Sequence, residues 1–201
     1  MRPSSAVPGR YTSRVMRTAG KALVAAVAAL AAAACDGEGS AEAGASPKPE
    51  PVLYANGHTL ARPTDDPGTL VFEGELLRLV NAHRVALGLH ALVDAPALRD
   101  LARGHSTHMI EHRFFDHSTP ESWAPGERLT GAGIDWTRVG ENIATGYAAP
   151  QAVFEAWLHS PSHRLNLEGE SWTHAGAGYA RDPSPSAEFP QAHYWTLLLV
   201  R

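Results

Sequence analysis

Three short segments contain the side chains that are best suited to chemistry. They are FDHS with His117, GENIA with Glu141, and WLHSPSHR with His163. Glycines, prolines and serines interrupt the sequence between them, so no single helix can align the three side chains and only tertiary folding can bring them together. Two neutral imidazoles could then share one Zn²⁺ ion and leave open positions for water or substrate. Glu141 could be a further ligand, or it could orient a histidine from outside the ligand shell.

These residues predict a reaction only if such a metal is catalytic. A Zn²⁺-bound water is acidified towards neutral pH, and Glu141 would be the general base of a hydrolysis. Two histidines without a third protein ligand make a weak site, however, which can bind metal reversibly without doing chemistry. We exclude a serine hydrolase, because Ser162 and His163 are neighbours on a turn and the chain has no Gly-x-Ser-x-Gly elbow.

The N-terminal 34 residues have the composition of a secretory signal. Residues 1–21 carry five basic residues and no acidic one, and a short apolar run follows up to Cys35, the only cysteine. Ala32-Ala33-Ala34 before Cys35 resembles a bacterial lipobox, in which the cysteine is acylated, although the leucine preferred there is replaced by Ala32. The alternative is plain cleavage after an Ala-x-Ala site. We predict a lipid anchor at Cys35 that holds an extracytoplasmic protein on the membrane, with simple secretion as the alternative.

Charge and composition narrow the classes of partner. Removing residues 1–34 changes the formal net charge from −4 to −9, because it takes away five basic residues and no acidic ones. Such an acidic protein is not expected to bind nucleic acid or to dock electrostatically on an anionic membrane. No cysteine follows Cys35, so no disulfide can form within the domain and the core must hold the fold. Residues 36–68 are rich in Pro, Ala and Gly and predict a disordered tether.

The remaining sequence predicts helices first and strands later. Apolar periodicity, caps and punctuating residues indicate helices from about Leu70 to Gly88, from Pro96 with Asp94 as N-cap to Arg113, and from Pro150 to Ser160. The stretch from Pro120 to Gly133 is expected to be irregular. Strands are expected at 175–180 and at 193–200, the second buried on both faces, and Val52-Leu53-Tyr54 could pair before a turn at Asn56-Gly57. This order predicts an α+β fold with a mainly antiparallel sheet covered by helices.

Seven motifs in order resemble a bacterial member of the CAP superfamily, named for cysteine-rich secretory proteins, antigen 5 and pathogenesis-related proteins. The resemblance covers about residues 69–201, which we take as the domain. Its motifs are Asn81-Ala82-His83-Arg84, His105-Ser106 with Met109, Phe114-Phe115-Asp116-His117, Gly140-Glu141-Asn142-Ile143-Ala144, Trp157 with Ser160-Pro161-Ser162-His163-Arg164, Gly176-Ala177-Gly178 and Tyr194-Trp195-Thr196. The resemblance implies a three-layer α-β-α sandwich with an open cleft.

Many members of this family place two histidines and two acidic residues in that cleft. The matching positions are His117, Glu141 and His163, whereas the second acidic position is Ser160 here, a departure that the bacterial subgroup shares. The sequence does not say whether Glu155 substitutes. The resemblance favours a functional cleft over purely structural histidines, with Asn142 fixing its loop through side-chain-to-backbone bonds. Trp157 and Trp195 are expected in the core.

A second group of histidines lies outside these motifs. His105, His108 and His112 share one face of the predicted helix at spacings of three and four residues. A metal site there is conceivable, but a partly buried polar face is the favoured interpretation.

Three hypotheses about function follow. The favoured one is a binding module at the cell envelope that holds a lipid-like or other envelope ligand in the cleft. The second is a metal-dependent hydrolase that uses His117, Glu141 and His163, against which the serine at position 160 counts. The third is a scaffolding lipoprotein with a vestigial cleft, which a buried and inaccessible His117 would favour.

Overall fold

This computed structural model describes residues 52–53, 59–60 and 66–201. The predicted signal segment 1–34, Cys35, the Asn56-Gly57 turn and most of the tether lie outside the described residues. The elements are β1 (Val52–Leu53), β2 (Thr59–Leu60), α1 (Pro67–Ala86), β3 (Val93–Asp94), α2 (Pro96–Glu111), α3 (Pro125–Gly131), β4 (Val139–Thr145), α4 (Pro150–His159), α5 (Pro161–Glu168), β5 (His174–Arg181) and β6 (His193–Val200). None of the helices in the described ranges is long and apolar enough to cross a membrane.

A four-stranded sheet in the order β3-β5-β6-β4 forms the centre of the domain. β6 pairs antiparallel with both β5 and β4, and β3 pairs parallel with β5 over two residues. The prediction of an α+β fold with a mainly antiparallel sheet is therefore confirmed. The strand β4, which carries Glu141, lies at one edge of the sheet, so one side of it is open to other elements. A separate two-stranded pairing of β1 with β2 confirms the short strand expected at Val52.

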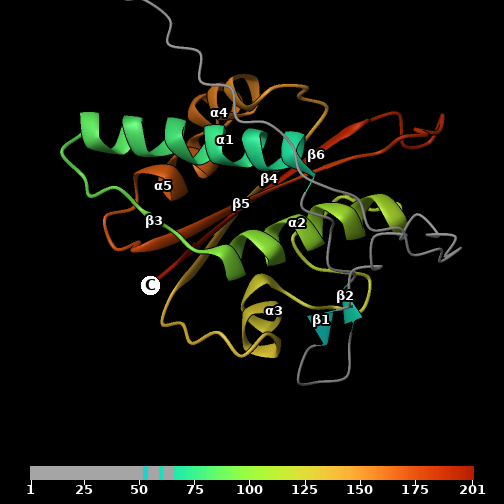
Figure 1. The fold of residues 1–201 in the computed structure, drawn as a ribbon, viewed down its shortest axis with the longest axis horizontal. Coiled ribbons are helices and arrows are strands. Elements are labelled where there is room, and N and C mark those ends of the chain that lie inside the picture. Colours follow the sequence, from blue (N-terminus) through green and yellow to red (C-terminus); the bar gives the residue numbers. More distant parts are fainter. Residues whose placement is uncertain (1–51, 54–58, 61–65) are drawn as a thin grey trace, which may run out of the picture. The chain divides into compact units, whose positions relative to one another are not determined.

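Helices cover both faces of this sheet (Figure 1). Side chains of β6 alternate between two cores, as the period of a strand requires. Trp195, Leu197 and Leu199 pack in a core with residues of α1, α4 and α5, whereas Leu198 and Val200 pack in a second core with residues of α2 and α3. The predicted three-layer α-β-α sandwich is confirmed, and Trp157 and Trp195 are buried core residues, as expected.

The helix α2 packs unusually close to β5. A Cβ atom built on Gly176 would lie 2.2 Å from the backbone nitrogen of Arg99, and one on Gly178 would lie 2.0 Å from that of Arg103. Only glycine permits this approach. The Ser106 hydroxyl, on the same face of α2, lies 2.9 Å from the Thr196 hydroxyl of β6.

Several local predictions were wrong. Asp94 belongs to β3, and Ala95 is the N-cap residue of α2, without a side-chain cap. The stretch expected to be irregular contains α3, which begins at Pro125 with the Glu127 carboxylate accepting from the Ala124 backbone N–H. The sequence analysis also lacks α5, which begins at Pro161 directly after the predicted helix end at Ser160, because proline is equally suited to the first position of a helix. α1 begins at Pro67, two residues before the expected domain start.

Candidate functional site

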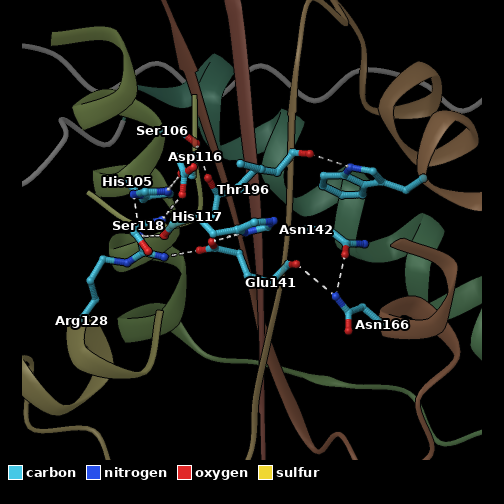
Figure 2. A network of polar contacts seen from close by, with 12 residues as sticks. His105, Ser106, Asp116, His117, Ser118, Arg128, Glu141, Asn142, Asn166 and Thr196 are labelled. Atoms are coloured by element: carbon cyan, nitrogen blue, oxygen red, sulfur yellow. Dashed lines mark hydrogen bonds and ion pairs between the residues drawn. The ribbon is translucent and has the colours of Figure 1, made fainter. Parts of the chain in front are cut away.

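The edge strand β4 presents Glu141 and Asn142 to opposite sides, because neighbouring side chains on a strand alternate. Figure 2 shows Glu141 directed towards Arg128 and His117, and Asn142 directed towards Asn166 of α5. Both side chains are buried. The strand therefore links the two helical layers at the place where the predicted site residues meet.

Glu141 is held by two partners at once. Its Oε1 lies 2.9 Å from Nδ1 of His117, and its Oε2 forms an ion pair with Nη2 of Arg128. The glutamate side chain is 2 % exposed, whereas that of His117 is 50 % exposed. The structure thus brings His117 and Glu141 together as predicted, with the imidazole reaching from a buried carboxylate to the surface.

Arg128, which the sequence analysis did not identify, connects the residues of the site. It is fully buried, and besides Glu141 its Nη1 donates to the backbone oxygen of His117 at 3.0 Å and to Nδ1 of His105 at 2.7 Å. His105 in turn donates from Nε2 to the backbone oxygen of Asp116 at 3.0 Å. Two buried side chains from α2 and α3 therefore hold the segment that presents His117 (Figure 2).

His105 is a structural residue. Burial, and to a lesser extent the positive charge of Arg128, lowers the pKa of His105 well below its ordinary value. The neutral ring fits its contacts, since Nδ1 accepts from an arginine while Nε2 donates to a carbonyl. His105 is therefore not available as a metal ligand together with the other histidines of α2.

His163 lies at the start of α5 and is held by different contacts. Its Nδ1 is 2.8 Å from the Ser160 hydroxyl, and its backbone oxygen accepts from the side-chain amide of Asn142 at 3.0 Å. Asn166 donates to Asn142 Oδ1 at 2.9 Å and to the Glu141 backbone oxygen at 3.0 Å. Asn142 thus makes the expected side-chain-to-backbone bond, although it lies in a strand and ties that strand to α5.

A cavity of about 280 Å³ adjoins His163. Ser160 and His163 supply its side-chain polar groups together with Thr145, and the other lining residues are apolar or aromatic, namely Phe115, Ile143, Ala144, Tyr147, Ala156 and Trp157. Glu155 does not line this cavity; it is exposed and accepts a hydrogen bond from Gln151 on its own helix. Glu155 therefore does not take the place of the acidic residue that Ser160 replaces.

The two site histidines have pKa values that shift in opposite directions. The hydrogen bond that His117 donates to the Glu141 carboxylate raises the pKa of His117 above its ordinary value, against a smaller opposing effect of burial. Burial lowers the pKa of His163, and the charge of His117 lowers it further. The opposite directions mean that His117 takes up a proton before His163 as the pH falls, and the effect of the His117 charge on His163 shows that the two rings interact.

The arrangement fits a metal only in part. With Nδ1 engaged, each of His117 and His163 retains Nε2 as a ligand atom. Both oxygens of Glu141 are engaged, so Glu141 occupies the orienting position rather than that of a ligand. Across the described part of the chain, no group of three containing these residues has ligand atoms that all lie within 4.8 Å of one another. A metal here would have two histidine ligands and solvent.

A larger cavity of about 820 Å³ lies elsewhere, around α3. Trp123, Pro125, Trp136 and Val139 form much of its apolar lining, and neither His117 nor His163 contributes to it. Its one ionisable lining residue, Glu127, caps the first turn of α3. The larger cavity therefore lacks the convergent polar groups that the smaller one has.

Comparison with known proteins agrees with these observations. Residues 77–199 match the family described as CAP, cysteine-rich secretory protein family. The chain is 35 % identical over 113 residues to the uncharacterized protein YkwD of Bacillus subtilis (strain 168), and 36 % identical over 109 residues to the uncharacterized membrane protein YlbC of the same organism. These alignments cover 56 % and 54 % of this chain but 44 % and 32 % of those proteins, so the chain matches less than half of either relative.

Solved structures show the same fold. An extracellular protein of Bacillus anthracis that contains an SCP domain superimposes with a TM-score of 0.58 at 26 % identity, over 69 % of this chain and 44 % of that one. An outer surface protein of Borrelia burgdorferi superimposes with a TM-score of 0.57 at 20 % identity, over 64 % of this chain and 90 % of that one.

Proposed function

The chain belongs to the cysteine-rich secretory protein (CAP) family, and from that premise we propose that it is an extracytoplasmic binding module of the cell envelope. The ligand would occupy the 280 Å³ cavity beside His163. The polar end of the ligand would meet His163 and Ser160. His117 does not line this cavity, but its charge acts on His163, so a ligand that extends out of the cavity would meet its exposed ring. Its apolar part would lie against the aromatic and aliphatic lining, which is the usual composition of a ligand site.

The single observation that carries this proposal is the support beneath His117. A half-exposed imidazole is held by a buried carboxylate, which is itself held by a fully buried arginine. A surface histidine needs no such support for solubility, whereas a recognition site requires side chains in fixed positions. The exposure of His117 also disfavours the scaffolding hypothesis with a vestigial cleft, which called for an inaccessible ring.

The apolar wall predicts a lipid-like ligand, which a cavity-filling variant tests. Ala156→Phe would place a ring in the cavity from α4, and we expect it to weaken binding of a fluorescent fatty acid at least about tenfold, since about 1.4 kcal/mol corresponds to that factor. Ala152→Phe is the matched control, because it lies one turn earlier on α4 and does not line the cavity. Equal binding by both variants, or no binding by the unmodified protein, would overturn the lipid-like assignment.

The metal-dependent hydrolase is the less well supported alternative. A carboxylate that accepts from His117 and is paired with Arg128 has no free oxygen directed at a water, so Glu141 is poorly placed as a general base. Zn²⁺ bound by His117 and His163 remains compatible with the binding role, with Glu141 orienting His117. The metal titration described in the next subsection tests this ion separately.

We also propose that Cys35 is acylated and anchors the domain to the membrane. The matched relatives include a membrane protein and an extracellular protein, which agrees with a position outside the cytoplasm. The unmodified protein should partition into the detergent phase of a phase-separating detergent, and Cys35→Ser should remain in the aqueous phase. If the two proteins partition equally, the proposed lipid anchor at Cys35 is wrong, whereas the proposal of a ligand in the cavity is unaffected.

A further inference from the structure

The C-terminal end of α2 carries a group of potential metal ligands outside the cleft. Residues 108–112 read His-Met-Ile-Glu-His, so two histidines lie one helical turn apart with a glutamate between them. Within the part of the chain that the structure describes, His108, Glu111 and His112 are the one group of three or more such residues whose ligand atoms all lie within 4.8 Å of one another. The two histidines have the spacing of the zinc ligands in the His-x-x-Glu-His pattern, in which the glutamate is not itself a ligand.

The two imidazoles lie side by side, with ring centroids 4.0 Å apart and an angle of 37° between the planes. The ligand atoms of the group lie within 4.8 Å of one another. Ligand atoms around tetrahedral Zn²⁺ are roughly 3.3 Å apart, given Zn–N distances of about 2.0–2.1 Å, so rotation of the side chains about their own bonds would bring them to an ion. Two protonated imidazoles this close would repel each other, whereas two neutral imidazoles could both bind one shared cation.

His108 is not a freely rotating surface residue. It is 9 % exposed and packs edge-on against Phe114 with ring centroids 5.5 Å apart. Its Nε2 lies 3.2 Å from Oε2 of Glu121, a residue of the connection between α2 and α3. A second carboxylate is thus present at the same ring, where it can orient the imidazole in the way that outer-shell carboxylates orient metal-bound histidines.

We propose that His108, Glu111 and His112 bind a divalent transition metal, Zn²⁺ or a neighbour of similar ligand preference, at the end of α2. Imidazole nitrogen and carboxylate oxygen are ligands that Zn²⁺, Ni²⁺ and Cu²⁺ accept. Neither of the two cavities described above is lined by these three residues, and we assign the bound metal a structural role.

The position of this site gives the metal a specific effect. The chain turns at Arg113, which has a positive φ of 52°, and continues through Phe115 to His117 before it reaches Glu121. An ion on α2 that also fixes His108 against Glu121 would hold both ends of this segment. The bound metal would therefore stiffen the segment that presents His117, independently of whether the cleft itself binds an ion.

Calorimetric titration of the untagged full-length protein with Zn²⁺ tests this proposal. We expect one ion at the helix end, in the unmodified protein and equally in the double variant His117→Ala/His163→Ala. His112→Ala should weaken this binding at least about 100-fold, since loss of even an outer-shell partner costs 10–100-fold. His112 is exposed, so this substitution is not expected to unfold the protein. His159→Ala is the matched control, because it removes an exposed imidazole from the end of a different helix.

The variants separate this site from the cleft. Zn²⁺ binding that survives His112→Ala unchanged, or that is absent from the unmodified protein, would overturn the helix-end site. Binding that disappears only in the His117→Ala/His163→Ala double variant would assign the ion to the cleft and would likewise overturn it. A second readout is thermal unfolding: Zn²⁺ should raise the Tm of the unmodified protein and of His159→Ala, but not that of His112→Ala.

Discussion

Glu73→Gln should destabilise the protein by about 3–5 kcal/mol, because it breaks a fully buried ion pair. The Glu73 carboxylate on α1 accepts from Nε of Arg103 at 2.7 Å and from Nη2 at 2.5 Å, and both side chains are at most 2 % exposed. The same carboxylate accepts from the Tyr179 backbone N–H at 2.9 Å, on the side of β5 that faces away from β6 and has no strand neighbour there, because β3 ends at Asp94. The pair therefore joins both helical layers to the sheet.

Thermal unfolding measures this loss as a fall in Tm of roughly 10–20 °C. Glutamine retains an acceptor for the Tyr179 N–H, so the variant tests mainly the charge. Glu75→Gln, on the same helix, removes an exposed partner of Arg78 and should change the Tm little. The double variant Glu73→Gln/Arg103→Met should recover at least half of the loss, because the buried cation is then absent as well. A Tm for Glu73→Gln within the range of the Glu75 control would contradict this account.

Burial raises the pKa of Glu73, which gives the pair a defined pH dependence. A carboxyl whose folded-state pKa is raised contributes stability below its unfolded pKa, and this contribution is lost as the pH rises through the folded-state value. Burying the ionised carboxylate is thus a cost at neutral pH that the contacts with Arg103 and Tyr179 offset only in part. This cost explains why removing one partner is harmful while removing both is tolerable.

The sequence predicted those features that local chemistry determines. β6 is apolar at almost every position from His193 to Val200, which indicated a strand buried on both faces, and the structure confirms it. The order of the family motifs predicted the three-layer sandwich. The proximity of His117 and Glu141 was also predictable, because the residues around each of them match family motifs, and the family places these two positions in one cleft.

What the sequence could not predict are contacts set by tertiary packing. Arg128 has no local signal that separates it from a surface arginine, yet it is buried and binds Glu141. His105 looked like one member of a three-histidine face, but Arg128 and the Asp116 carbonyl use both of its ring nitrogens. Only His108 and His112 of these three histidines therefore keep ring nitrogens that could bind a metal. The proximity of Glu121 to His108 depends on the path of the connection after α2, which no local pattern indicates.

Among the glycines that the structure describes, Gly178 should tolerate an added methyl group least. The added Cβ would lie 2.0 Å from the Arg103 nitrogen and 2.2 Å from the Ala102 carbonyl carbon. Both are backbone atoms, so no side chain can rotate away and α2 itself must shift by more than an ångström from β5. Overpacking usually costs 1–3 kcal/mol, and a clash with two backbone atoms belongs at or above about 3 kcal/mol.

A shift of α2 would also reach the site, because this helix carries His105, which supports the segment of His117, and the His108–His112 pair. We therefore expect Gly178→Ala to lower both the Tm and Zn²⁺ affinity, or to be recovered only as insoluble protein. Gly74→Ala is the matched control: it adds the same methyl group on α1, where nothing lies within 4 Å. In that helix alanine is favoured over glycine by about 0.5–1 kcal/mol, so the control should be neutral or slightly stabilising. If Gly178→Ala behaved like this control, α2 would not pack on β5 as closely as the structure describes. The conclusion that this packing positions the site residues of α2 would then also be wrong.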